Sequence, residues 1–491
     1  MAWNWYRTHM TSAAAVTITT ALTAITPGNA EAASAAAAEP LLQLVVAQKN
    51  ITLTRSRGQV FLDPGIWVAS RRAPLELRVS RKGYSAPLQI NQILRGPSGS
   101  TRSRRLPASV LPETPVGLKN FLRLTVKDQV GTVKATLPIS FCPNTSDPAR
   151  LTPTAPNSSP YPLLCGNNPF MLGHVWGVQK DWAADPTDAP PVLPLTPGKY
   201  EVTATITPAY VNLFHIPAAH ASSKVEVTVV DGQDTGIHSP APTAASTQVP
   251  PQAPPLSRAR TVTNPPKDSL PDMIALPAWD ISTGTESRRD LLNFAAAVWA
   301  SGDAPLDIQA FRKDNGSLTM DAYQYFWRNG KVIGQAPAGS MGFESDHDHD
   351  HWHYEQFARY RLLDADQKSV VKSQKTGFCI APTDPINLLL PHAPRQPVLG
   401  FAGRCGSPTA LWVRQTLPVG WGDTYPADIE GQAFDITSVP NGTYYVEITA
   451  NPQRVLHERS LTNDRTLRKV ILGGAAGNRS VKVSAWHGID G

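Results

Sequence analysis

The sequence predicts a mainly β protein, with two β-sandwich-type domains joined by a proline-rich linker. Apolar and polar residues alternate with period two in several short runs, which is typical of half-buried antiparallel strands. The chain contains 46 prolines, which disfavour long helices and favour short strands joined by irregular loops. Its 491 residues, of which 41% are hydrophobic, suffice for a core in each of two domains.

Residues 1–32 have the pattern of an export signal peptide. An apolar run of small residues spans 13–25, and an A-x-A-like cleavage site follows at 30–32. We therefore expect a mature chain that begins with an alanine-rich tether at 33–40 and is secreted or associated with the cell envelope. A retained N-terminal anchor is the alternative. No later run reaches the roughly 20 apolar residues that a membrane-spanning helix needs, so we expect no transmembrane span.

Residues 41–231 are predicted to form the first β-sandwich-like domain. Its clearest alternation is Leu75, Leu77 and Val79 with Glu76 and Arg78 between them. Similar runs lie at 122–126, 200–205 and 225–229. No catalytic group of residues stands out in this region, and its role stays open between spacing the second domain and binding an envelope or matrix polymer.

Residues 232–269 are predicted to be an extended linker, because prolines recur there among Ser, Thr, Ala and Gln and the hydrophobic periodicity stops. A second domain is expected at 270–475, followed by a tail at 476–491. The net charge of +6 would suit an acidic polymer or a cell envelope. No dense Lys/Arg stripe with interleaved aromatic residues is present, so we expect no nucleic-acid partner.

The four cysteines predict disulfide bonds, because an even number in an exported chain is typical of a disulfide framework. They fall into two local pairs, one in each half of the chain. Cys142–Cys165 with Cys379–Cys405 is the simplest of the three possible pairings. No C-x-x-C spacing is present, which disfavours a zinc ribbon or a thioredoxin-like site.

The densest group of potential metal ligands lies at residues 346–353, Asp-His-Asp-His-Asp-His-Trp-His. In a strand, residues i, i+2 and i+4 share one face, so alternate histidines would converge. Imidazole is a good ligand for copper, zinc, nickel or iron. A solvated Asp/His loop is the alternative, but the apolar residues that follow favour a position inside a folded domain.

This segment resembles the lysyl oxidase family, whose copper histidines have the spacing H-x-H-aromatic-H and are followed by a Phe, a Tyr and a Leu. The matching residues here are His349, His351, Trp352 and His353, then Phe357, Tyr360 and Leu362. The resemblance implies that His349, His351 and His353 bind copper. A triple of His347, His349 and His351 has the same spacing, so the part played by His347 stays open.

Two further segments resemble the same family. Residues 375–379, Lys-Thr-Gly-Phe-Cys, match its K-x-x-F-C segment, and residues 423–429, Asp-Thr-Tyr-Pro-Ala-Asp-Ile, match its D-T-Y-x-A-D-I segment. The resemblance implies that Lys375 and Tyr425 form a self-derived quinone cofactor, lysine tyrosylquinone (LTQ). The interval between them is longer than in animal members and proline-rich, as expected of a loop insertion that a Cys379–Cys405 disulfide would close.

The resemblance also points to a calcium site. Asp272 matches the residue that begins this site, and Glu458, Asn463 and Asp464 match a cluster near the end of the domain. Ser460 stands where an Asp is expected. Oxygen ligands of this kind suit calcium, whereas a solvated polar turn is the alternative.

Taken together, the resemblance implies a protein-lysine 6-oxidase-like copper amine oxidase. Such an enzyme converts a primary amine, either peptidyl lysine of a protein substrate or a free amine, to an aldehyde, and it consumes O2 and releases hydrogen peroxide and ammonia. Asp428 and Asp346 are candidate bases by their proximity to the motifs. The rival hypothesis is a non-enzymatic secreted copper-binding or structural protein. A zinc hydrolase is disfavoured, because no H-E-x-x-H motif is present.

Overall fold

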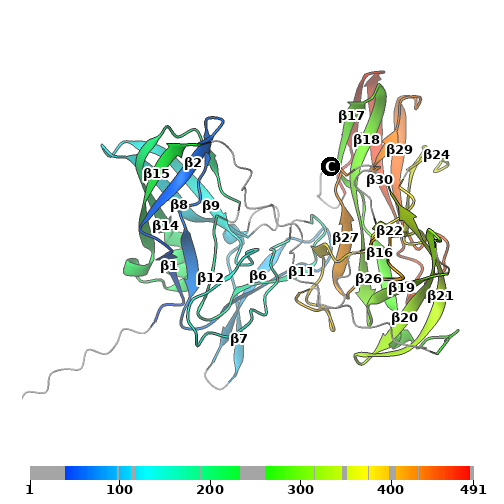
Figure 1. The fold of residues 1–491 in the computed structure, drawn as a ribbon, viewed down its shortest axis with the longest axis horizontal. Coiled ribbons are helices and arrows are strands. Elements are labelled where there is room, and N and C mark those ends of the chain that lie inside the picture. The colour runs from blue at the N-terminus through cyan, green and yellow to red at the C-terminus, as the bar shows by residue number, and fades with distance from the viewer. Residues whose placement is uncertain are drawn as a thin grey trace, which may run out of the picture. The chain divides into compact units, whose positions relative to one another are not determined.

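Strands dominate the structure, and the mainly β prediction is confirmed. The computed structural model describes residues 39–96, 99–111, 117–166, 168–187, 189–232, 260–313, 316–345, 351–373, 375–396, 405–429 and 431–486. The predicted signal peptide, most of the predicted linker and His347 and His349 lie outside these residues. We refer to described residues 39–232 as the N-terminal half and to described residues 260–486 as the C-terminal half (Figure 1).

The N-terminal half contains three sheets within its described residues. The seven-stranded sheet has the order β13 (Val192–Leu193), β3 (Gln59–Phe61), β2 (Asn50–Ser56), β15 (Ser222–Asp231), β14 (Gly198–Ile206), β8 (Leu118–Asp128) and β9 (Val133–Phe141). One four-stranded sheet has the order β1 (Leu42–Val46), β4 (Ile66–Ser70), β12 (Trp182–Ala184) and β10 (Ala149–Arg150). The other has the order β11 (Gly173–Val178), β5 (Leu75–Ser80), β6 (Gln89–Arg95) and β7 (Thr101–Arg105).

Helical structure is short. The α-helix α1 spans Pro208–Phe214, begins with a proline whose fixed φ suits the first helical turn, and ends at His215 with φ of 54°. Three 3-10 helices lie at Ala108–Val110, Ala218–His220 and Lys267–Ser269. No helix among the described residues is long and apolar enough to cross a membrane.

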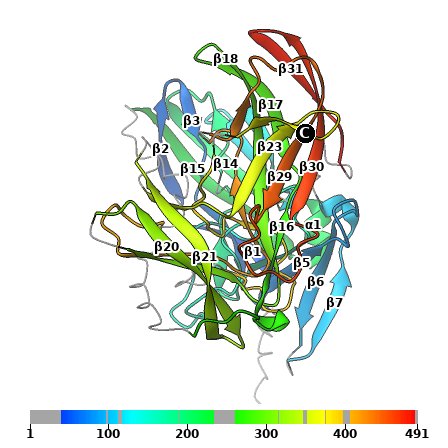
Figure 2. The same cartoon turned by 90° about the vertical axis from the view of Figure 1, so that its right-hand side faces the viewer.

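The C-terminal half also contains three sheets within its described residues. The first pairs β16 (Pro271–Ala275), β18 (Arg289–Gly302), β27 (Trp421–Tyr425) and β25 (Asp384–Pro385), and β17 (Trp279–Glu286) and β28 (Ala433–Asp435) also pair with β18. The second has the order β22 (His351–Tyr354), β21 (Lys331–Glu344), β20 (Thr319–Arg328), β19 (Leu306–Arg312) and β26 (Trp412–Leu417). The third has the order β24 (Ser369–Lys372), β23 (Ala358–Leu363), β29 (Gly442–Ala450), β30 (Arg465–Ala475) and β31 (Asn478–Val483), and its last four strands lie side by side in Figure 2.

Each half has its own main hydrophobic core. The core of the N-terminal half includes Trp176, Phe121 and Phe141, and the core of the C-terminal half includes Phe294, Trp352 and Tyr425. A smaller cluster joins the fully buried Phe170 of the N-terminal half to Leu276, Ala297, Trp299 and Ile386 of the C-terminal half. By their contacts, Glu39–Gly491 form one compact unit.

One position on a predicted strand departs from its alternation. Glu76 lies between apolar neighbours on β5, where period two would place it toward solvent, yet its side chain is fully buried. It forms ion pairs with Arg78, Arg95 and Arg395. These three cations compensate the burial of its charge, which would otherwise be strongly unfavourable.

The structure contains two disulfide bonds, Cys142–Cys165 in the N-terminal half and Cys379–Cys405 in the C-terminal half. They close loops with sequence separations of 23 and 26 residues. No described cysteine is free. The second bond encloses the proline-rich insertion, part of which forms strand β25 rather than an irregular loop throughout.

Candidate functional site

Two of the histidines of the H-x-H-aromatic-H motif lie on strand β22, which pairs with the end of β21. His351 and His353 share one face, and their Nε2 atoms are 2.8 Å apart. Trp352 between them is fully buried, packs against Phe343, and donates its indole N–H to the carbonyl of Ser407. The buried tryptophan therefore fixes the rotation of the strand that brings the two imidazoles together.

The spacing of the two imidazoles fits a bound metal ion. Two imidazole nitrogens that bind one ion at about 2.0 Å, with a right angle between the bonds, lie about 2.8 Å apart. Glu344 lies on the neighbouring strand, with Oε2 2.5 Å from Nδ1 of His353. A carboxylate in this position orients the ring and directs Nε2 toward a metal. Burial, followed by the nearby His351, lowers the pKa of His353 to about 4, so the ring is neutral, as metal binding requires.

His349 and the alternative ligand His347 lie outside the described residues. The part of the chain that the structure describes contains no group of three or more His, Cys, Asp or Glu side chains arranged to hold a metal ion. His351 and His353 are thus two described members of the predicted set, and the third ligand stays a prediction.

Lys375 and Tyr425 lie next to each other, as a cross-link between them would require. Nζ of Lys375 is 4.6 Å from the centroid of the Tyr425 ring and 5.5 Å from that of Phe378. The rings of Phe378 and Tyr425 make a T-shaped contact at 5.3 Å. Burial lowers the pKa of Lys375, which favours the neutral, nucleophilic amine.

The lysine segment lies beside the histidine strand through backbone bonds between Tyr354 and Phe378, one in each direction, of 2.8 and 3.1 Å. Gly377 makes this approach possible, because a Cβ at that position would lie 2.6 Å from Cβ of His353. The Cys379–Cys405 disulfide joins the same two regions. The carbonyl of Cys379 accepts a hydrogen bond from the Tyr425 hydroxyl, and that of Cys405 accepts one from the N–H of Trp352.

Asp423 is a site residue that the sequence reasoning passed over. It is buried on β27, and its Oδ2 accepts a hydrogen bond of 3.0 Å from the Tyr425 hydroxyl. Burial raises the pKa of the Asp423 carboxyl well above its ordinary value, and burial together with Asp423 raises that of Tyr425. The signal was present in the Asp-Thr-Tyr segment, because residues i and i+2 of a strand share one face.

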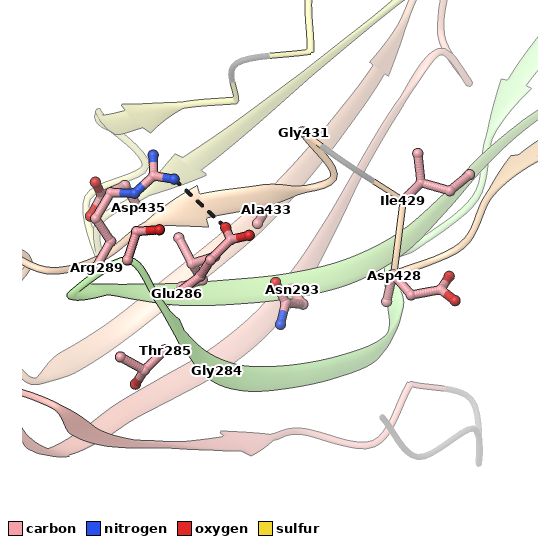
Figure 3. A pocket seen from close by; sticks show the side chains of 13 residues that line it. Gly284, Thr285, Glu286, Arg289, Asn293, Asp428, Ile429, Gly431, Ala433 and Asp435 are labelled. Carbon is pink, nitrogen blue, oxygen red and sulfur yellow. Dashed lines mark ion pairs between the residues drawn. The ribbon is translucent and has the colours of Figure 1, made fainter. Parts of the chain in front are cut away.

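A polar pocket of about 590 Å³ lies close to this site but on another face of the sheet. It lies between the β17–β18 hairpin and residues 427–435, and Arg289 forms an ion pair with Glu286 at its wall (Figure 3). Tyr425 pairs with Ala296 on β18. Leu291 and Asn293, an odd number of residues away from Ala296 on the same strand, point to the opposite face of the sheet and line the pocket. Asp428, one of the two candidate bases, lines this pocket and is exposed; the other, Asp346, lies outside the described residues.

The residues of the predicted calcium site also come together. Nδ2 of Asn463 donates to Oδ1 of Asp272, and the backbone N–H of Met273 donates to Oε2 of Glu458. Burial and the nearby Asp464 raise the pKa of Glu458 to about 8, and burial and Asp272 raise that of Asp464 to about 6. Within the described residues, Oδ1 of Asn463 and Oδ1 of Asp464 are buried without a hydrogen-bond partner. Buried oxygens without a hydrogen-bond donor fit a bound cation. The ligands of this cation would have to include the side-chain oxygen of Asn463 as well as the carboxylates.

Comparison with known proteins finds sequence similarity in the half of the chain that contains this site. Residues 324–478 match the lysyl oxidase family model. Protein-lysine 6-oxidase of Homo sapiens is 27% identical over 201 residues, which cover 40% of this chain and 44% of the relative. Protein-lysine 6-oxidase of Sus scrofa is 32% identical over 113 residues, 22% of this chain and 39% of the relative. Lysyl oxidase homolog 1 of Homo sapiens is 34% identical over 112 residues, 22% of this chain and 17% of the relative.

The matched region contains the two described histidines, Lys375, Tyr425 and the cluster near Asp464, whereas Asp272 precedes it. This chain spans less than half the length of each of the three relatives named above. The converging imidazoles, the lysine beside the tyrosine and the family match all lie in the C-terminal half, and residues 324–478 of this half resemble the lysyl oxidase family.

Proposed function

We propose that this chain is an exported, copper-dependent amine oxidase whose quinone cofactor forms from Lys375 and Tyr425. It would convert primary amines, either peptidyl lysine or free amines, to aldehydes, with O2 consumed and hydrogen peroxide and ammonia released. The proposal rests mainly on the position of the Lys375 amine. This amine lies 4.6 Å from the Tyr425 ring centroid and near two converging imidazoles. At the level of the family, the relatives support amine oxidase function.

His351 and His353, with His349 as the third ligand, would hold the copper, and Glu344 would orient His353. Copper would supply the oxidation that forms the quinone with O2, and the quinone would supply the electrophilic carbonyl for the substrate amine. Lys375 supplies a partly desolvated amine on a flexible side chain that can swing toward the ring. Phe378 packs against the Tyr425 ring and also lies 5.5 Å from this amine, so it covers part of the ring beside Lys375.

Asp423 is our candidate for the base that takes a proton from the bound substrate. It is the carboxylate in contact with the Tyr425 hydroxyl, so it lies next to the ring where the substrate amine would react. A buried carboxylate with a raised pKa is a stronger base than an exposed one, as general base catalysis near neutral pH requires. Of the two candidates from the sequence, Asp428 lines the neighbouring pocket and Asp346 lies outside the described residues.

Export of the chain is part of the proposal. It rests on the signal-like residues 1–32 and on two disulfide bonds, which persist in oxidising compartments. Calcium, bound by Asp272, Glu458, Asn463 and Asp464, is a further proposed component that would stabilise the domain.

The Lys375→Ala variant tests the cofactor most simply. We expect the wild type, expressed from Ala33 with copper, to develop a visible quinone band that shifts with phenylhydrazine, and the variant to bind copper without that band. Lys368→Ala, at an exposed lysine on the same stretch of chain, should behave as the wild type. Copper binding without a quinone band in the wild type would favour the non-enzymatic copper-binding protein.

Calcium binding is tested by metal removal. Calcium at about 100 times its Kd should stabilise the folded protein by about 2.7 kcal/mol, which raises Tm by about 5–10 °C relative to a chelated sample. Asp464→Asn should remove most of this increase, because it removes the charge of the carboxylate that has one of the two unpartnered oxygens. Asp366→Asn, at an exposed position, is the matched control. Equal Tm values of the wild type with and without millimolar calcium would contradict the site.

A further inference from the structure

The N-terminal half makes backbone hydrogen bonds to the proline-rich insertion of the C-terminal half. The N–H groups of Leu172 and Gly173 both donate to the carbonyl of Ile386, at 2.7 and 3.1 Å. The N–H of Leu388 donates to the carbonyl of Gly173 at 2.8 Å, and Gly173 forms a parallel bridge with Asn387. A Cβ at Gly173 would lie 2.3 Å from Oδ1 of Asn387, so a larger residue there would displace the Asn387 side chain.

Side chains extend the contact around Phe170, a buried aromatic residue of the N-terminal half. Phe170 is fully buried and belongs to the small cluster that contains Trp299 and Ile386. Its ring makes edge contacts with Trp279 and Trp486 of the C-terminal half, at centroid distances of 5.7 and 5.5 Å. A phenylalanine enclosed in this way is the type of anchor that dominates the energy of an interface.

Polar contacts hold the proline-rich insertion at Arg395 and Gln396. Nε2 of Gln396 donates to the carbonyls of Tyr161 and Ser159, at 2.6 and 3.2 Å. Arg395 forms an ion pair with the fully buried Glu76 at 3.5 Å. Backbone, apolar and charged contacts therefore hold residues 383–396 against the N-terminal half.

The same segment supports the strand that carries the proposed cofactor. Asp384 and Pro385 pair with Gly422 and Trp421 of β27. The N–H of Thr383 donates to the carbonyl of Gly422 at 3.0 Å, and Oγ1 of Thr383 accepts from the N–H of Thr424 at 2.7 Å. Thr424 stands between Asp423 and Tyr425, so residues 383–385 bind the backbone of the site directly.

We propose that the N-terminal half is a positioning element, which clamps residues 383–396 and through them holds Asp423 and Tyr425 in place for cofactor formation. This role rests on the proposed function, and it differs from that of a spacer or polymer-binding module. His351 and His353 lie on β22, which belongs to another sheet, so copper binding should not depend on the clamp.

Hydrogen exchange of the full chain tests the clamp without any need for catalysis. Phe170→Ala removes the anchor, whereas Phe121→Ala removes an equally buried phenylalanine that packs only within the core of the N-terminal half. We expect amides of residues 383–388 and 421–424 to exchange about tenfold faster in Phe170→Ala, with little change there in Phe121→Ala, because exchange reports local opening. Equal rates in the two variants would overturn the proposal.

Cofactor formation provides the second readout. The quinone band of Phe170→Ala should appear about tenfold more slowly than that of the wild type after copper addition, at unchanged copper content. The double variant Arg395→Ala/Gln396→Ala, which leaves the aromatic cluster intact, should show a smaller effect of the same sign. Faster exchange with an unchanged rate of band formation would overturn the positioning role, whereas a wild type without any band would refute the proposed function and leave exchange as the test of the clamp.

Discussion

Replacement of Tyr425 by phenylalanine is expected to abolish amine oxidation while copper stays bound. The variant keeps the ring that packs against Phe378 but lacks the hydroxyl that donates to Asp423 and to the carbonyl of Cys379. Because the ring oxygen is the starting point of the quinone, turnover should fall by at least about three orders of magnitude, as when an essential member of a catalytic unit is removed. Peroxide release and metal analysis measure the two properties separately.

The loss of the hydroxyl also removes one of the donors to the buried Asp423, which keeps its backbone hydrogen bond from Ala381, and should cost about 1–3 kcal/mol of stability. A matched control separates this cost from the chemistry. Tyr444 in the same half donates its hydroxyl to the carbonyl of Pro440, so Tyr444→Phe should lose a comparable hydrogen bond and keep its activity. Amine turnover by Tyr425→Phe near that of the wild type would rule out this tyrosine as the cofactor precursor.

The second large effect is expected at the metal. His353→Ala should weaken copper binding by at least about 100-fold, because even removal of a group that merely orients a ligand costs about 10–100-fold. No quinone band should form, since the oxidation needs the metal. Glu344→Gln should have the smaller, orienting effect, because the carboxylate touches Nδ1 of His353 and not the predicted ion. Competition with a chelator of known affinity measures both.

His215→Asn is the control for nonspecific binding by histidine. His215 is exposed in the N-terminal half and has φ of 54°, a conformation that asparagine tolerates well, so the variant should fold and bind copper as the wild type does. Unchanged copper affinity in His353→Ala would contradict the assignment of β22 as the copper strand.

Part of this site could be predicted from local sequence, because four of its members, His351, His353, Asp423 and Tyr425, lie on strands. Alternation with period two places His351 and His353 on one face, and the same rule applied to Asp423 and Tyr425 would have identified the buried carboxylate. Lys375 was predicted from the resemblance of residues 375–379 to the family's K-x-x-F-C segment, and its amine lies 4.6 Å from the Tyr425 ring centroid. Local spacing suffices where the geometry is set by one strand.

Contacts between distant segments could not be predicted in this way. The strand pattern placed Glu76 toward solvent, but arginines from three segments, one of them Arg395, compensate its burial. The insertion was expected to be a loop, yet residues 384–385 extend the sheet of Tyr425 and the next residues bind Gly173. Such pairings depend on tertiary structure, and a single sequence carries no local sign of them.

The most direct test of the central claim is peptide mass spectrometry of the copper-loaded wild type. Reaction of one lysine and one tyrosine to the proposed cofactor adds one oxygen atom and removes four hydrogen atoms in total. We predict a single cross-linked species that contains the Lys375 and Tyr425 peptides with this mass change, formed only after copper is added in the presence of O2. Recovery of both peptides separate and unmodified from a fully copper-loaded sample would contradict the assignment of Lys375 and Tyr425 as the cofactor.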